Sequence, residues 1–308
     1  MKISIVATLY KSSQHIQEFY QRVSAAATQL ADDDYEIVLV NDGSPDNSLD
    51  LAIHISELDS HVIIVDLSRN FGHHKAMMTG LAQSIGQYVF LIDCDLEEDP
   101  EWLIPFAELM ATEKCDVVYG MQKQRKGSFF EKWSGHFFYR FFKAFTGIAL
   151  PENVVTARLM TRRYVNALLL HKERELFIAG LWHITGFNQI PQTVKKHNSS
   201  ETTYTLRKKA SLLVNSVTSF SNAPLIGIFY FGVLISISAI IYIIYLLVNW
   251  MFLTNPLIGW TSVMASIWLI GGMIISFIGV IGIYLSKVFS ETKRRPYTIV
   301  RHIYASKK

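Results

Sequence analysis

The sequence predicts an α/β protein in which a doubly wound, mostly parallel sheet is followed by a two-helix transmembrane hairpin. Three observations carry this prediction. Strand-like and helix-like segments alternate over the first 120 residues, two carboxylates directly follow one strand-like segment, and the C-terminal third contains two long apolar runs. Such alternation is typical of a parallel sheet with helices on both faces.

The N-terminal elements are placed by hydrophobic periodicity. Strands are expected over 3–9, 35–40 and 62–67, with a fourth that ends at Asp93. Helices are expected over 13–30, 46–58 and 74–84. The first strand resembles a signal peptide only superficially, because its apolar core is short, alternates with polar residues and lacks a small-residue cleavage site. We therefore expect the globular part to stay in the cytoplasm.

The pattern is less regular after Gly120. Residues 129–145 form an aromatic-rich amphipathic segment, and 158–170 is a helix candidate. Residues 206–222 have helical spacing and a basic start, which predicts an amphipathic helix at the membrane surface.

The C-terminal third indicates membrane insertion. No Asp, Glu, Lys or Arg occurs between Lys209 and Lys287, and the apolar runs 225–248 and 260–285 each exceed the roughly 20 residues of a spanning helix. The linker between them is uncharged, whereas 287–308 is a basic tail, so the positive-inside rule places both termini in the cytoplasm. The domains expected are a cytoplasmic domain over 1–205, the interfacial helix over 206–222, the two spans within 223–286 and the tail.

Charge and cysteine content exclude other classes. The formal net charge is only +3, and the clustered basic residues flank the apolar runs, which favours headgroup contacts over a nucleic-acid surface. Two cysteines are too few for a disulfide framework or a zinc site.

The most informative motif is Asp93-Cys94-Asp95 after the apolar run 88–92. Two carboxylates at the end of a buried strand suit a Mg²⁺ or Mn²⁺ ion, which binds few carboxylates together with phosphate oxygens. Asp42 and the segment 68–70 also follow predicted strands, so these groups should meet at the carboxyl edge of the sheet. Gly43 permits a tight turn after Asp42.

Several spaced motifs together resemble glycosyltransferase family 2, in particular the enzymes that load sugars onto polyprenyl phosphates, which include dolichol-phosphate mannose synthases and bactoprenol glucosyltransferases. The motifs are Val40-Asn41-Asp42-Gly43-Ser44, Arg69-Asn70-Phe71-Gly72, Asp93-Cys94-Asp95-Leu96, Arg158-Leu159-Met160 and Ser219-Phe220-Ser221. They occur in order over nearly the whole chain, and the resemblance implies a GT-A-type, Rossmann-like sheet.

The resemblance implies roles for individual residues. Those expected to bind the nucleotide sugar are Thr8, Tyr10, Asp42, Asn70 and Asp93. Those expected to hold Mg²⁺ or Mn²⁺ are Asp93, Asp95 and Glu97, where family members usually have Gln at the last position. The acceptor phosphate would be bound by Arg125, Ser134 and Arg158, and the residues expected to act in catalysis are Asp95, Arg158 and Arg125.

One departure from the family concerns the acceptor. The usual Gly-Asp-Phe-Arg-Leu segment, whose Asp is a suspected catalytic carboxylate, is Val155-Thr156-Ala157-Arg158-Leu159 here. A missing base typically costs about 10² to 10⁴ in rate for a hydroxyl acceptor. A phosphate acceptor is already an anion at neutral pH, so Thr156 is compatible with it. A hydroxyl acceptor would need a substitute such as Glu152 or Glu173.

The sequence thus predicts a metal-dependent, inverting transferase that moves a sugar from a nucleotide-diphosphate sugar to a polyprenyl phosphate for cell-envelope glycan or O-antigen modification. Its expected place is the bacterial inner membrane, as a two-span protein and a possible homo-oligomer that binds no nucleic acid. Two alternatives remain: a membrane glycosyltransferase that extends a lipid-linked saccharide, and a non-catalytic membrane relative.

Overall fold

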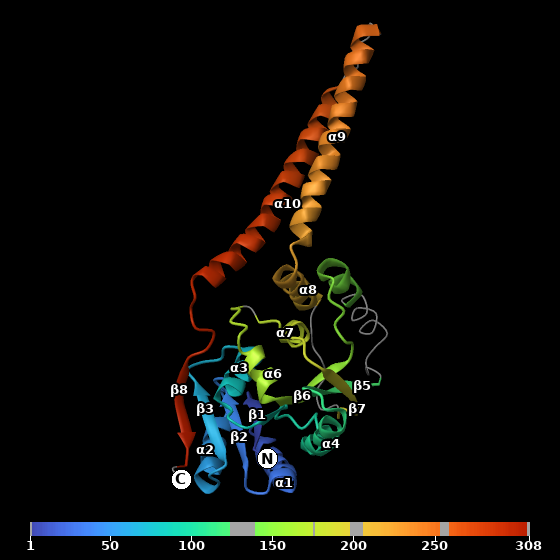
Figure 1. Cartoon of the computed structure of the whole chain (residues 1–308). Coiled ribbons are helices and arrows are strands. Elements are labelled where there is room, and N and C mark those ends of the chain that lie inside the picture. Colours follow the sequence, from blue (N-terminus) through green and yellow to red (C-terminus); the bar gives the residue numbers. More distant parts are fainter. Residues whose placement is uncertain (1, 124–138, 175, 198–205, 253–258, 307–308) are drawn as a thin grey trace. The chain divides into compact units, whose positions relative to one another are not determined.

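The computed structural model describes residues 2–123, 139–174, 176–197, 206–252 and 259–306 (Figure 1). The chain divides into two compact units. The first comprises residues 1–139, 150–204 and 295–308, and the second comprises 140–149 and 205–294. Each unit is described by itself below.

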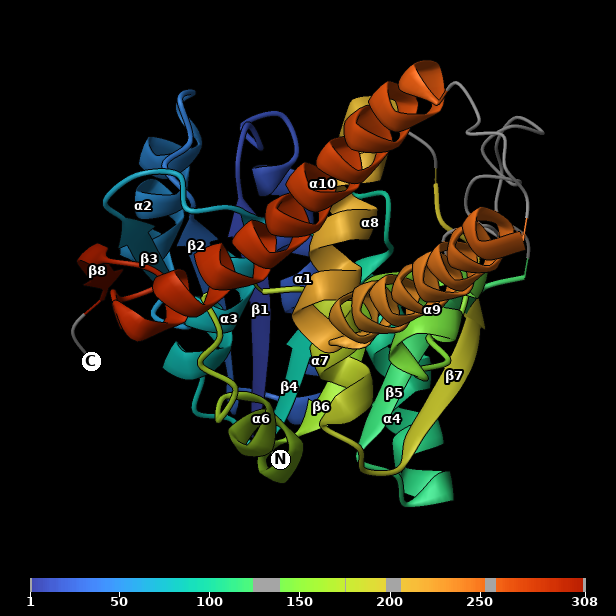
Figure 2. The same ribbon diagram turned by 90° about the horizontal axis from the view of Figure 1, so that it is seen from above.

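The first unit is built on an eight-stranded sheet, counted over the described residues, with the order β7-β5-β6-β4-β1-β2-β3-β8 (Figures 1 and 2). Its strands are β1 (Ile3–Leu9), β2 (Tyr35–Asn41), β3 (Val62–Leu67), β4 (Tyr88–Leu91), β5 (Val117–Gln122), β6 (Val154–Thr161), β7 (Gln189–Val194) and β8 (Val300–Ala305).

The pairing confirms a mostly parallel sheet. Strands β4, β1, β2 and β3 are mutually parallel, and β5 and β7 are parallel to each other. Strand β6 runs antiparallel between β4 and β5, and β8 runs antiparallel to β3. The carboxyl ends of the first four strands therefore lie along one edge, where the predicted motifs meet.

Helices cover both faces of this sheet. The core packs α1 (Ile16–Ala31), α2 (Ser48–Leu58) and α4 (Leu103–Glu113) against one face. Helix α3 (His73–Gln83) packs against the other face so closely that a Cβ at Gly80 would lie 2.5 Å from a Val6 methyl. The short helices α6 (Arg162–Leu168) and α7 (Ile178–Ile184) follow β6, and the turn η1 (Pro100–Trp102) precedes α4.

Local sequence explains the first elements. All seven residues of β1 are buried, as in a parallel strand covered on both faces. Helix α1 buries Ile16, Phe19, Val23 and Ala27, the spacing of a single helical face.

The helix predicted over 158–170 is wrong over its first four residues. Residues 154–161 form β6, and α6 begins only at Arg162. The period is two rather than 3.6: Val155, Ala157 and Leu159 belong to the core cluster, so Arg158 lies on the opposite face of the sheet. A short apolar run such as 154–161 is compatible with either a helix or a strand. Pairing with β4 on one side and β5 on the other makes it a strand.

The segment expected as a basic tail contains a strand. Helix α10 (Trp260–Thr292) continues past residue 287, and β8 then covers the outer edge of β3. The Ser68 amide donates to the Ile299 carbonyl over 2.9 Å, and the Thr79 and Thr298 hydroxyls are 2.8 Å apart. The end of the chain is therefore part of the same sheet as its beginning.

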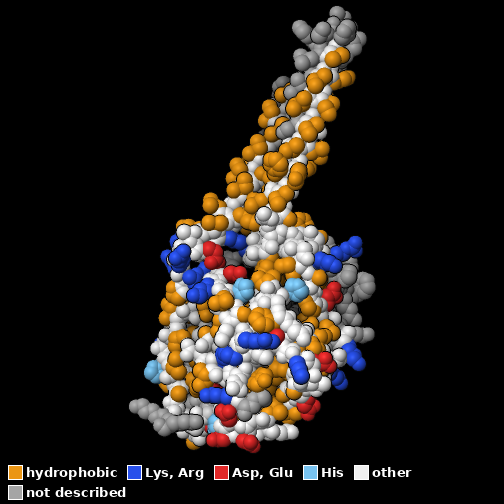
Figure 3. All heavy atoms as spheres, in the orientation of Figure 1, with side chains coloured by type: hydrophobic (Ala, Val, Ile, Leu, Met, Phe, Trp, Pro, Cys, Tyr) orange, Lys and Arg blue, Asp and Glu red, His pale blue; other side chains and the backbone are white. Residues whose placement is uncertain are grey.

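The second unit is helical and apolar. It contains α8 (Leu206–Phe220), α9 (Ala223–Phe252) and α10. Within α9 and α10, residues Ala223–Tyr242 and Leu269–Thr292 are long and apolar enough to cross a membrane, with mean hydropathies of 2.3 and 2.2, and none of these residues is buried. Hydrophobic side chains dominate the visible surface of both helices (Figure 3). These are the two apolar C-terminal helices that the sequence predicted.

Candidate active site

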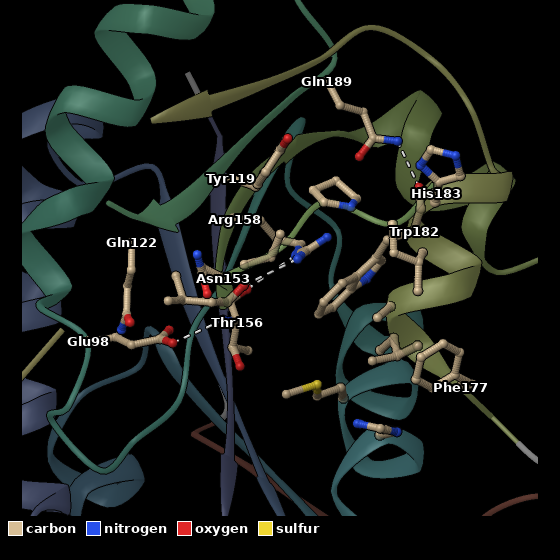
Figure 4. A pocket seen from close by; sticks show the side chains of 18 of the residues that line it. Glu98, Tyr119, Gln122, Asn153, Thr156, Arg158, Phe177, Trp182, His183 and Gln189 are labelled. Carbon is tan, nitrogen blue, oxygen red and sulfur yellow. Dashed lines mark hydrogen bonds between the residues drawn. The ribbon is translucent and has the colours of Figure 1, made fainter. Parts of the chain in front are cut away.

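A cavity of about 920 Å³ opens in the first unit beside the carboxyl ends of the central strands (Figure 4). Its walls come from the start of α3, the segment after β4, strands β5 and β6, helix α7 and the segment after β7. Charged, aromatic and aliphatic side chains all line it, which is the composition of a binding site for an amphipathic ligand.

The predicted aspartates lie next to this cavity. Asp93 follows β4, and its Oδ1 atom is 3.2 Å from Nε2 of His73, the first residue of α3. The other ring nitrogen of His73 is 3.0 Å from the Thr8 hydroxyl. Asp95 accepts a 3.0 Å hydrogen bond from the Glu97 amide. The ends of β1 and β4 and the start of α3 thus converge on Asp93.

The pKa values of the two aspartates are shifted in opposite directions. Burial alone would raise the pKa of Asp93, but His73 and the Thr156 side chain favour its ionised form, and the pKa lies below its usual value. Burial and the charge of Asp93 hold the pKa of Asp95 above its usual value. Two carboxylates this close repel each other, so a cation between them would be stabilised.

These two residues fit a Mg²⁺ or Mn²⁺ ion. The Asp93 Oδ1 atom is buried and contacts the His73 ring at 3.2 Å, which leaves it lone pairs for a cation, and such ions bind with one or two carboxylates plus substrate phosphates. Among the described residues, no group of three or more His, Cys, Asp or Glu side chains is gathered as a metal centre. Glu97, predicted as a third ligand, pairs with Lys196 over 2.9 Å, and its role toward a metal stays a prediction.

Asp42 is 2% exposed and holds the segment after β3. Its two oxygens accept hydrogen bonds from the Phe71 and Gly72 amides at 2.7 and 3.0 Å. Gly43 has φ of 60°, and a Cβ there would lie 2.4 Å from the Asn70 nitrogen. Sequence analysis assigned Asp42 to the nucleotide and explained Gly43 by its turn; the packing of both against 69–72 becomes visible only in three dimensions.

The remaining predicted nucleotide contacts are spread along the same edge. Thr8 is buried at the end of β1, whereas Tyr10 is 47% exposed and Asn70 is exposed. Their roles toward a nucleotide stay predictions. Arg125 and Ser134, predicted to bind phosphate, lie outside the described residues.

Arg158 lies on β6 with only 1% of its surface exposed and lines the cavity. Its guanidinium stacks on the Trp182 ring and donates hydrogen bonds to the Thr156 and Val155 carbonyls. No carboxylate among the described residues lies within ion-pair distance, and burial lowers the pKa of Arg158 to about 9. A buried cation without an acid partner is costly unless a ligand supplies the anion.

Glu98 is a residue of this site that sequence analysis did not assign. It is fully buried and accepts hydrogen bonds from the Thr156 and Ala157 amides at 3.0 and 2.7 Å, which fastens the segment after β4 to β6. Burial and the charge of Asp93 raise the pKa of Glu98 to about 7. Its position beside Glu97 is visible in the sequence, but which of the two turns inward is not.

The sheet order and the aspartates after β4 define the class of fold: the first unit is of the GT-A type. In fold it is similar to the solved structure "Mannosyltransferase PcManGT from Pyrobaculum calidifontis in complex with GDP-Man and Mn2+", with a TM-score of 0.50 and 16% identity over 70% of this chain and 62% of that one.

Sequence comparison identifies the family. Residues 4–169 match "Glycosyl transferase family 2". A Mycobacterium tuberculosis relative named "Putative glycosyltransferases" is 50% identical over 99% of this chain and 89% of its own. The "Bactoprenol glucosyl transferase" of Shigella phage SfV is 29% identical over 98% and 99%. The chain belongs to glycosyltransferase family 2, as its motifs predicted.

Proposed function

We propose that this enzyme transfers a sugar from a nucleotide-diphosphate sugar to a polyprenyl phosphate, with inversion at the anomeric carbon. The relative named bactoprenol glucosyl transferase, matched over nearly its whole length, supports a lipid acceptor. The two helices of membrane-spanning length support the same assignment. The observation that carries the proposal is that the carboxylates in the cavity wall are already bound to other groups of the protein, which leaves no general base among the described residues of that wall for a hydroxyl acceptor.

Both carboxylates that line the cavity among the described residues are engaged. Glu98 holds two backbone amides, and Glu97 pairs with Lys196. Thr156 lies where the family's Asp was expected, while Glu152 and Glu173, the possible substitutes, are not part of the cavity wall. A hydroxyl acceptor needs a general base. A phosphate monoester, already ionised at neutral pH, needs mainly positioning and charge balance.

The donor end of the proposed site is formed by Asp93 and Asp95. A bound Mg²⁺ or Mn²⁺ ion would offset the charge that develops on the leaving diphosphate. His73 keeps Asp93 ionised and fixes its orientation through the bond to Thr8. The amides of Phe71 and Gly72, bound to Asp42, set the position of the segment that borders the nucleotide.

The acceptor end would use Arg158, together with Arg125 and Ser134. A guanidinium binds phosphate through two parallel hydrogen bonds and keeps its charge when buried. Placing the cation on a central strand rather than a loop fixes its position before the ligand arrives, which reduces the reorganisation needed during transfer.

We further propose a bacterial inner-membrane location with both termini in the cytoplasm. Strands β1 and β8 belong to one sheet, so a chain that crosses the membrane twice between them has both ends on the same side. The arginines and lysines from residue 287 onward favour the cytoplasmic side.

The direct test uses the full chain purified in detergent. It would be incubated with Mg²⁺ or Mn²⁺, a polyprenyl phosphate and a panel of nucleotide sugars, and the lipid product would be detected by mass. We expect one lipid-monophosphate sugar of inverted anomeric configuration, and its loss with EDTA. Transfer to a saccharide hydroxyl alone would overturn the proposal in favour of chain extension.

A further inference from the structure

Two side chains in contact at the cavity are incompletely matched by the protein. The indole nitrogen of Trp182 has no hydrogen-bond partner, although the residue is only 8% exposed. The Arg158 guanidinium donates to two backbone carbonyls, but its buried charge has no carboxylate partner among the described residues. Buried donors are normally satisfied and buried charges are normally paired, so these two groups need an explanation. Both line the same cavity.

The two side chains are held firmly in place. The Trp182 carbonyl accepts hydrogen bonds from the Tyr164 hydroxyl at 3.0 Å and the Gln189 amide at 2.7 Å, which fixes α7 against α6 and β7. The Arg158 Nε atom donates to the Thr156 carbonyl over 3.2 Å. Rigid support of this kind preorganises donors for a ligand.

Their stacking determines what they can bind. The Arg158 guanidinium lies over the Trp182 ring, so its N–H groups and the indole N–H belong to the same part of the cavity wall. Figure 4 shows the two side chains next to each other, with His183 beyond them. An anion with several oxygens can accept from both side chains at once, whereas a neutral hydroxyl cannot compensate the arginine charge.

The rest of the wall indicates what carries the anion. Apolar side chains come from α3, from the start of β6 and the segment before it, and from α7, among them Met77, Leu150, Val154 and Ile178. An anionic group joined to a hydrocarbon chain satisfies both parts of this lining. A free sugar or a nucleotide would leave the apolar part without a matching partner.

Resting on the proposed function, we propose that Arg158 and the Trp182 N–H together bind the phosphate of a prenyl phosphate, and that the adjoining apolar wall takes its first isoprene units. Acceptor recognition is then confined to the head of the lipid. Short prenyl phosphates such as farnesyl phosphate bind and accept sugar without the rest of the lipid chain.

The sharpest test is Trp182→Phe, which keeps a ring for stacking and removes the N–H. A hydrogen bond to a charged group is worth about 1.5–3 kcal/mol, so we expect KM for farnesyl phosphate to rise about 10-fold or more while KM for the nucleotide sugar is unchanged. Trp102→Phe is the matched control, because Trp102 packs on Phe106 and is not part of the cavity wall; it should alter neither KM.

Two outcomes would overturn the inference. An unchanged KM for farnesyl phosphate in Trp182→Phe would show that the N–H does not bind the acceptor. A selective rise in KM for the nucleotide sugar would assign the pair to the donor.

Equilibrium binding separates this inference from the proposed function. Farnesyl phosphate should bind the wild-type chain without donor, and Trp182→Phe should weaken that binding by a similar factor. If binding follows this pattern but no sugar is transferred to any prenyl phosphate, the proposed function fails and the subsite stands.

Hydrogen exchange in the wild-type chain gives a readout that needs no variant. Farnesyl phosphate should slow exchange in residues 178–184, whereas farnesol and inorganic phosphate, each lacking one half of the ligand, should do so much less. Equal protection by farnesol would show that the anion is not recognised, and equal protection by inorganic phosphate would show that the apolar wall is not used.

Discussion

Buried acidic residues around the cavity serve two different purposes. Asp42 and Glu98 accept pairs of backbone amides and so fix the segments that follow β3 and β4. Asp93 contacts the His73 ring and Asp95 accepts from the Glu97 amide, and both are proposed to bind the cation. The sequence analysis assigned Asp42 to the ligand and left Glu98 unassigned, because amide acceptance depends on segments 29 to 59 positions apart in the chain.

The first residue-scale prediction concerns Asp95. Asp95→Asn removes a carboxylate proposed to hold the metal, and we expect the transfer rate to fall by about 10² to 10³, the usual cost of losing one group that stabilises transition-state charge. The measurement is initial rate at saturating Mn²⁺. Asp99→Asn is the matched control from the same segment, since Asp99 contacts Arg22 and His197 rather than the cavity. Equal activity of wild type and Asp95→Asn would exclude a metal role for Asp95.

The second residue-scale prediction concerns the pH dependence of stability. His61 lies between Asp59 at 2.7 Å and Asp33 at 2.9 Å. Burial would lower the pKa of His61, but the two carboxylates outweigh it and raise the pKa above its usual 6.5. The protonated ring therefore stabilises the fold below pH 6.5, and this contribution is lost as pH rises through the raised pKa. Wild type should exceed His61→Gln in thermal midpoint more at pH 6 than at pH 9. A difference that grows with pH would contradict the assignment.

At the scale of elements, strand β8 reaches the donor side of the sheet. Arg301 lies 3.4 Å from Asp66, which is 1% exposed, and donates a 2.6 Å hydrogen bond to the Ser68 carbonyl. Asp66 in turn accepts from the Asn41 amide at 2.8 Å. The segment 68–72 is therefore held by β8 on one side and by Asp42 on the other.

Arg301→Ala should consequently weaken both stability and donor binding. We expect the free energy of unfolding to fall by about 1–3 kcal/mol, because the buried Asp66 loses its cation. KM for the nucleotide sugar should rise several-fold while the acceptor KM is unchanged. Arg295→Ala, at an exposed arginine just before β8, is the control. A stability loss without any change in donor KM would limit β8 to a structural role.

The elements that sequence predicted best are those fixed by local pattern. The bounds of β1 and β3 agree with the predicted 3–9 and 62–67, because both are largely apolar segments that turns separate from their neighbours. The aspartate site followed from those strands, since their carboxyl ends share an edge. Strands β5 to β8 were missed, because a short polar or mixed segment becomes a strand only when a neighbour supplies hydrogen bonds. The contacts of Trp182 and Lys196 likewise depend on chain packing that periodicity does not encode.

At the scale of the whole molecule, the proposed topology gives a cellular prediction. A green fluorescent protein fused after residue 308 should fluoresce, because that end is expected in the cytoplasm, where the reporter folds. A fusion after residue 252, at the end of α9, should be dark, because only one span precedes it. Fluorescence from both fusions, with the chain in the membrane fraction, would contradict two crossings.

The position of β8 also has a consequence for synthesis. The ribosome makes this strand only after both long helices. Until then the outer edge of β3 has no partner, and exposed edges invite pairing with other chains. A nascent chain stalled within the helices therefore keeps an open edge on its sheet. Strand β8 thus makes completion of the sheet depend on synthesis of the whole helical pair.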